Sequence, residues 1–481
     1  MTFLSPRRLL GFCMVWLLVA CHGNPTPVEP YGARETAAGP PRQPAAPGLF
    51  VSPPLAGPGN PAGRAGEAAV LANEARTRAP GSAEPLAPFF LRLAELERGR
   101  GHEPVTIVQF GDSHTAGESF TAHLRARFQA RFGSAGRGML PPGVPFRAYH
   151  PQLVKITQSA GWTALSSFDA GSTAAFGMTG FRSEAHQAGA VMALEADEGT
   201  PGGGLAALEA LMQPGGGSLE VRAPGLPPRT LATAASAPQA ALLLLPLPPG
   251  PARMEVAVRG DGPVDLLAWG LERRGPGIVF DSYGINGTTV GILDRWDGTA
   301  MAFELQWRAP SLIIVAFGTN EGWNDNLDRE RYAREFAGEL GRLRALAPRA
   351  ALLVLGPPDG NRRAAACGAR QGRASCMPAG GTCSWAPPPN LAVVRDVQRR
   401  IAEASGAAFW DWSGPMGGEC GIHDWATRTP PLAYADHVHL SKEGYELTAD
   451  ALFETLMRQY AEFLRSAPVS SLEGAVVGMT P

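Results

Sequence analysis

Two short segments, far apart in the chain, hold residue types that together can cleave an ester. Gly-Asp-Ser-His occupies residues 111–114, and Asp-His-Val-His occupies residues 436–439. In a serine hydrolase, a histidine takes the proton of the serine hydroxyl, and an aspartate fixes the tautomer of that histidine and stabilises its imidazolium form. Asp436 and His439 are three residues apart, so one turn of chain can bring the carboxylate to the imidazole ring. We therefore predict a catalytic triad of Ser113, Asp436 and His439.

Ser113 on its own also has a structural interpretation. A serine at the start of a helix commonly caps it by accepting a hydrogen bond from a backbone N–H group. The end of a strand that leads into a helix is equally the place where a nucleophile is accessible and where unpaired amides face a developing anion. The residues at 436–439 favour the catalytic role. We expect His437, one residue from Asp436, to be a packing or solvated histidine.

An ester hydrolase further needs hydrogen-bond donors for the oxyanion of its tetrahedral intermediate. Tyr-Gly-Ile-Asn-Gly at residues 283–287 and Phe-Gly-Thr-Asn-Glu at residues 317–321 each end a predicted strand. A glycine lets its backbone amide approach a substrate closely, and an asparagine amide donates without changing its protonation state. Asn320 is the side-chain candidate, whereas Gly284 and Gly287 are both candidates for the backbone amide.

The hydrophobic pattern predicts the elements that bring these segments together. A buried strand is expected at residues 105–110, and the helix after it places Phe120, Phe128 and Phe132 on one side. Strands and helices then alternate, which predicts an α/β fold: a three-layer α/β/α sandwich around a five-stranded parallel sheet, with the strands' carboxyl ends at one edge. The other expected strands are residues 278–285, 312–317, 352–355 and 408–412, and the helices are 290–296, 328–346, 391–404 and 443–464.

A different pattern separates the first strand from the rest. Between residues 147 and 274, glycine and proline interrupt segments with two-residue alternation, such as Met254, Val256 and Val258. This pattern predicts an inserted all-β module. The full division is a signal peptide at 1–20, a Pro/Ala/Gly-rich tether at 21–81, hydrolase parts at 82–146 and 275–465, the module at 147–274 and a tail at 466–481.

The N-terminus predicts export. Two arginines precede an apolar stretch at residues 9–20 that is too short to span a bilayer. Leu-Val-Ala-Cys at residues 18–21 resembles a bacterial lipobox, which implies cleavage before Cys21 and acylation of that cysteine. An ordinary signal peptide with an incidental cysteine is the alternative. Since no later apolar run is long enough to cross a membrane, lipid on Cys21 is the expected anchor.

Charge and composition argue against several other functions. The net charge of -2 gives no basic field of the kind that nucleic acids require, so we expect no nucleic-acid partner. The glycine-rich stretches at residues 133–138, 199–204 and 215–217 do not open helices after strands, and they are interpreted as loops rather than phosphate cradles. No cofactor and no metal are expected.

Four cysteines remain after the N-terminal segment: Cys367, Cys376, Cys383 and Cys420. In an oxidising compartment an even number allows disulfides, in three possible connectivities. Their spacing does not match a zinc site, and free thiols are the remaining alternative. Residues 359–388 form a long segment with little periodicity, and such loops are often functional. We predict a disulfide from this loop, with Cys420 as a candidate partner, that supports the rim of the site.

Taken in order, the Gly-Asp-Ser-His, Asn-Gly, Gly-Thr-Asn-Glu and Asp-x-x-His segments are similar to the four blocks of the SGNH (GDSL-type) hydrolase family. The resemblance spans residues 105–464, apart from the inserted module. It implies that Ser113 is the nucleophile, with Asp436 and His439 completing the triad. It also implies that the amide of Gly287, rather than that of Gly284, joins the Ser113 amide and the Asn320 side chain in an oxyanion hole.

Within that family, the Gly-Asp-Ser-His block and the β insertion resemble the peptidoglycan O-acetylesterases of Gram-negative bacteria, whose insert is a jelly roll like that of a carbohydrate-binding module. The resemblance implies a membrane-anchored lipoprotein, facing the periplasm or the cell surface, that removes acetyl esters from an O-acetylated glycan. An O-acetyltransferase would use the same residues and is the first alternative. A non-catalytic glycan-binding lipoprotein is the second, and it is disfavoured because all five catalytic positions are filled.

Overall fold

The computed structural model describes residues 48–56, 84–147, 149–172, 175–197, 204–273, 275–363, 376 and 385–466. The predicted signal peptide, Cys21, most of the predicted tether and nearly all of the C-terminal tail lie outside these residues. Within the described part, no helix is both long and apolar enough to cross a membrane.

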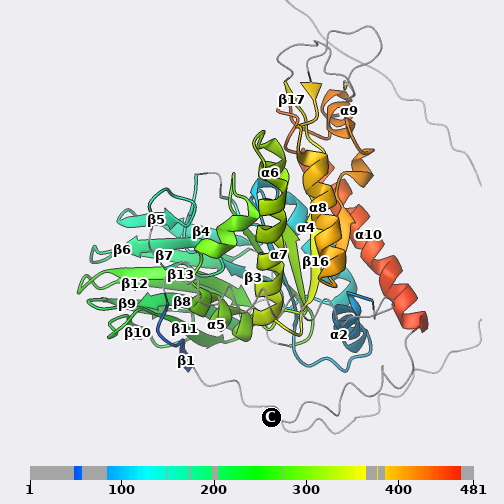
Figure 1. Cartoon of the computed structure of the whole chain (residues 1–481). Helices are drawn as coiled ribbons and strands as arrows, with labels where there is room; N and C mark the ends of the chain where they lie inside the picture. The colour runs from blue at the N-terminus through cyan, green and yellow to red at the C-terminus, as the bar shows by residue number, and fades with distance from the viewer. Residues whose placement is uncertain are drawn as a thin grey trace, which may run out of the picture. The chain divides into compact units, whose positions relative to one another are not determined.

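A five-stranded parallel sheet forms the centre of the hydrolase fold (Figure 1). All seven residues of its first strand in the sequence are buried, because helices cover both faces of the sheet. This arrangement confirms the predicted α/β sandwich. In spatial order the strands are β14 (Ile278–Gly284), β2 (Val105–Gly111), β15 (Leu312–Ala316), β16 (Ala351–Gly356) and β19 (Ala408–Asp411).

The side chains of β2 alternate between the two hydrophobic layers. Val105 and Ile107 pack among helices on one face, and Val108 and Phe110 pack among helices on the other. The first face is covered by α2 (Ala87–Glu97), α4 (Ser119–Phe132) and α10 (Lys442–Ser466). The second is covered by η1 (Val290–Arg295), α5 (Gly298–Arg308), α7 (Arg329–Leu346) and α8 (Leu391–Ala404).

Two antiparallel sheets form the inserted module. Strands β6 to β13 follow the double Greek-key order of a jelly roll, with β6-β13-β8-β11 in one sheet and β7-β12-β9-β10 in the other. The predicted jelly-roll-like, all-β character is therefore confirmed. The strands are β4 (Val154–Gln158), β5 (Trp162–Ser166), β6 (Phe181–Ala185), β7 (Val191–Ala196), β8 (Gly204–Met212), β9 (Ser218–Arg222), β10 (Arg229–Ala232), β11 (Gln239–Leu247), β12 (Arg253–Val258) and β13 (Val264–Glu272).

One part of the predicted tether is wrong. Residues of the segment predicted to be an unpacked linker form β1 (Gly48–Val51), which pairs antiparallel with the edge strand β11. Leu49, Phe50 and Val51 are strand-forming residues, and β11 offers them an unpaired edge. The composition of the surrounding linker concealed this short strand. The module sheet also recruits β3 (Gly136–Leu140), which pairs with β13 although it precedes residue 147.

A buried ion network joins the module to the hydrolase fold. Arg308 on α5 donates two hydrogen bonds to the carboxylate of Asp281 on β14, at 2.7 and 2.9 Å. Its remaining Nη1 atom lies 2.7 Å from Oε1 of Glu272 on β13 of the module. All three side chains are nearly inaccessible to solvent. The network therefore holds β13 of the module against β14 of the parallel sheet.

Candidate active site

The first site segment is a tight turn at the carboxyl end of β2. Asp112 caps α3 (Ser113–Ala116) by accepting a hydrogen bond from the backbone N–H of His114 at 3.0 Å. Asp112, not Ser113, therefore has the capping role, and the Ser113 hydroxyl remains available for chemistry. The turn requires Gly111, because an added Cβ would lie 2.1 Å from Oγ1 of Thr115 and 2.7 Å from the carbonyl oxygen of Ala316.

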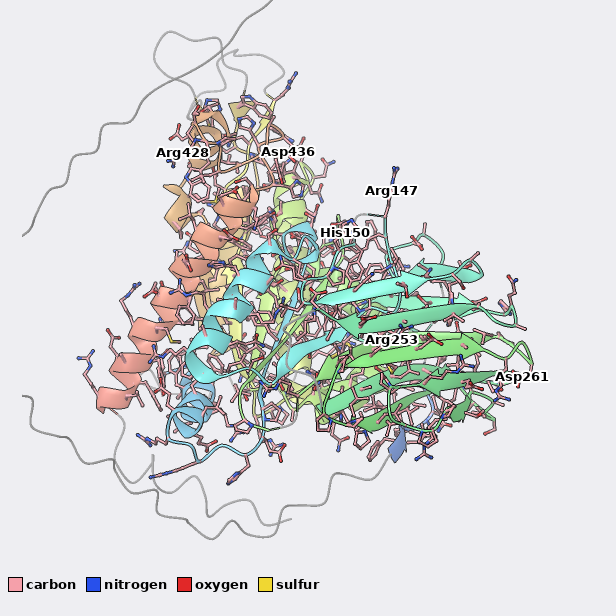
Figure 2. All side chains as sticks on the ribbon, turned by 180° about the vertical axis from the view of Figure 1, so that it is seen from behind. Arg147, His150, Arg253, Asp261, Arg428 and Asp436 are labelled. Carbon is pink, nitrogen blue, oxygen red and sulfur yellow. A yellow bond between two sulfur atoms is a disulfide. The ribbon has the colours of Figure 1, made fainter. Side chains whose placement is uncertain are left out.

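The structure brings the three predicted triad residues into one hydrogen-bonded line. Nε2 of His439 lies 2.9 Å from Oγ of Ser113, and Nδ1 of His439 lies 2.7 Å from Oδ2 of Asp436. The other carboxylate oxygen of Asp436 accepts hydrogen bonds from the backbone N–H groups of Val438, at 2.9 Å, and of His439, at 3.0 Å. Figure 2 shows Asp436 at one end of the hydrolase fold, remote from Asp261 at the tip of the module.

The charge state of Asp436 follows from these contacts. Partial burial by itself raises the pKa of this carboxyl, but the hydrogen bonds from the His439 ring and from the two backbone amides outweigh it and hold the pKa below its usual value. Asp436 is therefore ionised at neutral pH. An ionised aspartate at Nδ1 leaves Nε2 of His439 free to accept the proton of the Ser113 hydroxyl.

The loop after β14 lies directly beside this turn. The backbone N–H of Ile285 donates to the carbonyl of Gly111 at 3.1 Å, and Nδ2 of Asn320 donates to the carbonyl of Thr288 at 2.7 Å. These two bonds place the oxyanion loop, residues 285–290, between the nucleophile turn and α6 (Thr319–Trp323). Gly287 is exposed in this loop and has a φ of 77°.

The geometry distinguishes the two glycine candidates. A Cβ on Gly284 would lie 2.2 Å from the backbone nitrogen of Ala116, so Gly284 permits close packing of β14 against α3. The nearest atoms to a Cβ on Gly287 are 3.7 Å away, in the ring of Phe168. Gly287 is thus exposed, with only ordinary van der Waals contact to Phe168 at this distance, which makes it the better candidate for an amide that meets a substrate.

His114 and Glu321, which flank the proposed catalytic residues in sequence, both have structural contacts. Nδ1 of His114 lies 2.8 Å from the hydroxyl of Tyr445, and burial, followed by the nearby charge of His439, lowers the pKa of His114 to about 3. Oε1 of Glu321 accepts a hydrogen bond from the backbone N–H of Val290 at 2.9 Å, and burial raises the pKa of Glu321 to about 8. Both side chains are uncharged at neutral pH, and Glu321 holds the end of the oxyanion loop.

His437 is a packing residue, as expected. Its backbone has a φ of 55°, and its ring stacks on Trp385 with 3.6 Å between ring centroids. Nε2 of His437 lies 3.1 Å from Nδ1 of His423 on α9 (Gly421–Thr427). Burial lowers the pKa of His437. No sequence pattern indicated a role for Trp385, because its partner lies more than fifty residues away.

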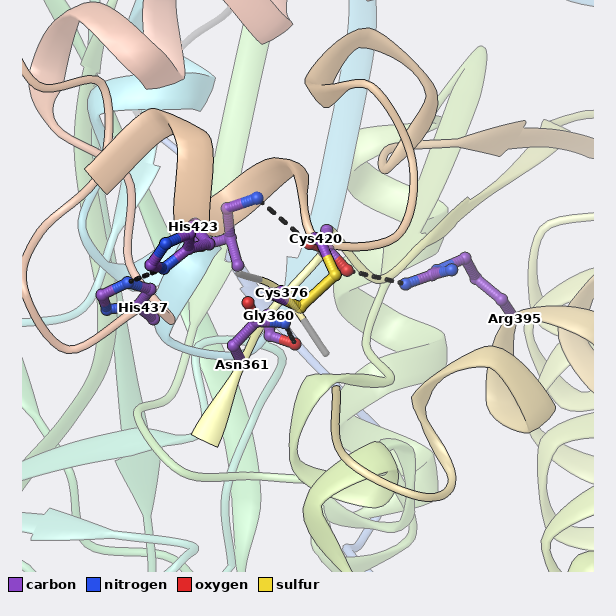
Figure 3. The surroundings of a disulfide bond; sticks show 9 residues. Gly360, Asn361, Cys376, Arg395, Cys420, His423 and His437 are labelled. Carbon is purple, nitrogen blue, oxygen red and sulfur yellow. Dashed lines mark hydrogen bonds and ion pairs between the residues drawn. A yellow bond between two sulfur atoms is a disulfide. The ribbon is translucent and has the colours of Figure 1, made fainter. Parts of the chain in front are cut away.

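A disulfide supports the same side of the site. Cys376 and Cys420 are bonded, which agrees with the predicted bond from the long loop to Cys420 (Figure 3). Next to it, the backbone N–H of Ile422 donates to Asp359 at 3.0 Å, and the backbone N–H of Asn361 donates to the carbonyl of His437 at 2.9 Å. The other two cysteines, Cys367 and Cys383, lie outside the described residues. Among the residues that the structure describes, no group of acidic, histidine or cysteine side chains could hold a metal ion.

The sequence matches the GDSL-like Lipase/Acylhydrolase family over residues 234–447. This range contains Gly287, Asn320, Asp436 and His439, whereas Ser113 precedes it. The fold supplies what the sequence match omits, since β2, which leads to Ser113, pairs between the matched strands β14 and β15. No curated protein matches the sequence.

Solved structures resemble the chain to different extents. The structure described as "Peptidoglycan O-acetylesterase in action, 5 min" is 25% identical, with a TM-score of 0.64, and the match covers 80% of this chain and 98% of that one. A family two carbohydrate esterase from Clostridium thermocellum in complex with cellohexaose is 12% identical, with a TM-score of 0.27, over 63% of this chain and 99% of that one. One from Cellvibrio japonicus is also 12% identical, with a TM-score of 0.25, over 65% of this chain and 99% of that one. Of these three, the O-acetylesterase structure alone has a TM-score above 0.5.

Proposed function

We propose that this chain is a GDSL-type (SGNH) carboxylic ester hydrolase that removes acetyl groups from an O-acetylated glycan of the cell envelope through an acyl-enzyme on Ser113. The observation that carries the proposal is the continuous line of hydrogen bonds from Asp436 through His439 to Ser113, at 2.7 and 2.9 Å. Such a line is the arrangement by which a serine becomes a nucleophile at neutral pH.

The proposed reaction has two steps. In the first, Oγ of Ser113 attacks the ester carbonyl while Nε2 of His439 takes its proton, and the imidazolium then protonates the departing sugar oxygen. The acetyl group remains on Ser113. In the second, His439 deprotonates a water molecule that attacks the acetyl carbonyl. The bond to Oγ of Ser113 then breaks, the imidazolium protonates Oγ, and acetate is released. Ionised Asp436 stabilises the imidazolium in both steps.

The oxyanion of each tetrahedral intermediate would face three donors: the backbone amides of Ser113 and Gly287 and the side-chain amide of Asn320. One hydrogen of the Asn320 amide is used by the carbonyl of Thr288, and this bond orients the second hydrogen. A fixed donor is more effective than a mobile one because it needs no reorganisation when the charge develops.

Peptidoglycan is the proposed substrate because the similar O-acetylesterase structure is matched over 98% of its length. The match covers 80% of this chain, which is more than the hydrolase fold alone. The sequence supports the compartment that this substrate requires. We propose that Cys21 is lipidated after export and that the chain faces the periplasm or the cell surface. The Cys376–Cys420 disulfide is consistent with an oxidising compartment.

The test compares wild type with Ser113→Ala on O-acetylated peptidoglycan, with released acetate as the readout. Wild type should release acetate, and the variant should release none above background. Ser119→Ala, which also removes a hydroxyl from the first residue of a helix, serves as the matched control and should retain activity. Transfer of acetyl groups to a glycan acceptor with little free acetate would replace the esterase proposal with an acetyltransferase. Glycan binding without turnover of any acetate ester would replace both.

A further inference from the structure

The inserted module places an exposed aromatic ring beside the oxyanion loop. Phe168 follows β5 of the module and is 50% exposed. A Cβ built on Gly287 would lie 3.7 Å from both Cε1 and Cζ of Phe168, so the ring is within van der Waals range of the space above that glycine. Phe168 is therefore a large apolar side chain that lies outside the hydrophobic core and close to the proposed oxyanion hole.

The backbone around Phe168 is held in place by its own turn. The Phe168 N–H donates to Oγ of Ser166 at 3.1 Å, and the Ser166 N–H donates to Oδ2 of Asp169 at 3.1 Å. The N–H of Ser167 donates to the carbonyl of Gly180 at 2.9 Å. The ring of Phe168 therefore projects from a fixed turn, and little conformational freedom remains to be lost when a ligand binds.

The hydrolase fold anchors this turn from the other side. Nε1 of the buried Trp296 donates to Oγ of Ser167 at 3.0 Å, and Nη2 of Arg295 donates to the carbonyl of Asp169 at 2.9 Å. Gly180 has a φ of 68°, and a Cβ there would lie 2.5 Å from Cδ1 of Ile285, the first residue of the oxyanion loop. Contacts from the module thus reach the loop that is bonded to the nucleophile turn.

We propose that Phe168 is a specificity-determining residue whose ring stacks on the apolar face of the sugar that carries the scissile ester. This inference rests on the proposed function. The C–H groups of a pyranose form an apolar surface of about the size of a phenyl ring, and covering the ring removes apolar area of both partners from water. An acetyl methyl group is too small to cover a half-exposed ring. The acyl group therefore does not explain the position of Phe168.

The proposal predicts that loss of the Phe168 ring affects the hydrolysis of two substrates differently. Phe168→Ala should lower kcat/KM on O-acetylated peptidoglycan by about tenfold, mostly through KM, because stacking stabilises the bound substrate and the transition state alike. Hydrolysis of a small alkyl acetate such as ethyl acetate, which has no ring to stack on Phe168, should change by less than about twofold. Phe168→Trp should restore activity on the glycan.

Phe50→Ala is the matched control. Phe50 lies on β1 of the same module, is 51% exposed and therefore tests the general effect of removing a half-exposed phenyl ring. It should leave both activities unchanged.

Three outcomes would overturn the inference. An unchanged kcat/KM of Phe168→Ala on the glycan would show that the ring does not bind sugar, and an equal loss on both substrates would show that Phe168 only shapes the oxyanion loop. Wild type that hydrolyses the alkyl acetate but releases no acetate from any O-acetylated glycan would overturn the proposed function itself, and this inference with it. That result is distinguishable because it appears in the wild type before any variant is compared.

Discussion

Ser113 and His439 meet in one hydrogen bond but reach it from very different surroundings. Ser113 follows a strand whose seven residues are all buried and which pairs with neighbours on both sides. His439 lies in a loop where the two catalytic side chains are partly open to solvent, with exposed fractions of 38% for His439 and 46% for Asp436. The central sheet therefore fixes the position of Ser113, whereas contacts outside the sheet must fix the position of His439.

Tertiary contacts outside the sheet hold the base in position. His437, between the two catalytic residues of the loop, stacks on Trp385 and contacts His423, and its carbonyl accepts a hydrogen bond from Asn361. The Cys376–Cys420 disulfide lies beside these contacts. The two halves of the active site therefore differ in which changes should damage them. Packing changes should damage the nucleophile side, whereas loss of a few tertiary contacts or of the disulfide should damage the base side.

The largest expected effect is chemical and lies on the base side. Asp436→Asn should lower kcat about 10⁴-fold, because a neutral amide neither fixes the productive tautomer of His439 nor stabilises its imidazolium form. The melting temperature should change little, since Asp436 is half exposed and bonds only within its own loop. Steady-state kinetics with thermal melting measures both. A large fall in melting temperature would mean that the loop is part of the stable core, contrary to the comparison.

On the nucleophile side, we expect a smaller loss of activity that is accompanied by a loss of stability. In Gly111→Ala, the new methyl group would lie 2.1 Å from Oγ1 of Thr115 and 2.7 Å from a backbone oxygen, so the turn must shift. We expect about a hundredfold loss of activity, since a displacement near 1 Å has such an effect, together with a destabilisation of about 1–3 kcal/mol. Denaturant unfolding and initial rates measure the two effects.

Gly117→Ala is the control for this substitution. Gly117 ends the same short helix with a helical backbone conformation, and the nearest atom to an added Cβ is at 3.4 Å. Its activity should stay within about twofold of wild type, and its free energy of unfolding should stay within about 1 kcal/mol of wild type. If Gly111→Ala behaved like this control, the turn would be more compliant than the packing around Gly111 indicates.

Removal of the disulfide should have a weaker effect, confined to the base side. Cys376→Ser combined with Cys420→Ser should lower activity by about tenfold and the free energy of unfolding by about 2–4 kcal/mol. The nucleophile turn should be unaffected, because α3 contacts β2, β14 and α4, and His114 bonds to Tyr445 of α10, none of which belongs to the disulfide loop. The split can be measured by amide hydrogen exchange, which should increase at residues 433–441 of the base side and stay unchanged at residues 111–116 of the nucleophile turn. An equal increase in exchange at both segments would contradict the separation of the two halves.

The sheet and the triad could be predicted because both leave local signals. Buried parallel strands are continuous apolar runs, and the predicted ranges of residues 312–317 and 391–404 agree closely with β15 and α8. Asp436 and His439 are neighbours in sequence, so their spacing alone predicted their contact. Asp297, which caps α5 by accepting from two backbone N–H groups, was an available signal for a helix that the prediction omitted.

The remaining features depend on partners that are distant in sequence. β1 exists because β11, about 190 residues later, offers a free edge. Trp385 and Phe168 look like any other aromatic residues until the fold places one under His437 and the other beside Gly287. Spacing cannot reveal such contacts, since each is formed by loops from different parts of the chain.

The oxyanion loop joins the two halves of the site, and Glu321 gives it a pH dependence with a definite sign. Burial raises the pKa of Glu321 from 4.5 to about 8 in the folded protein. The folded state therefore binds a proton that the unfolded state releases above pH 4.5. The stability contributed by this protonation is complete below pH 4.5 and is lost as the pH rises to about 8.

Glu321→Gln retains an acceptor for the backbone N–H of Val290 but cannot ionise. We therefore expect the variant to gain stability relative to wild type between pH 4.5 and 8, by up to about 5 kcal/mol, and the difference to level off above that range. Urea unfolding at several pH values measures it. Glu330→Gln, which removes an exposed carboxylate at the start of α7, should show no such trend. A constant difference in the free energy of unfolding between Glu321→Gln and wild type across this range would mean that water reaches Glu321. The oxyanion loop would then be open on its inner side, and it would resemble the exposed base side of the site rather than the buried nucleophile side.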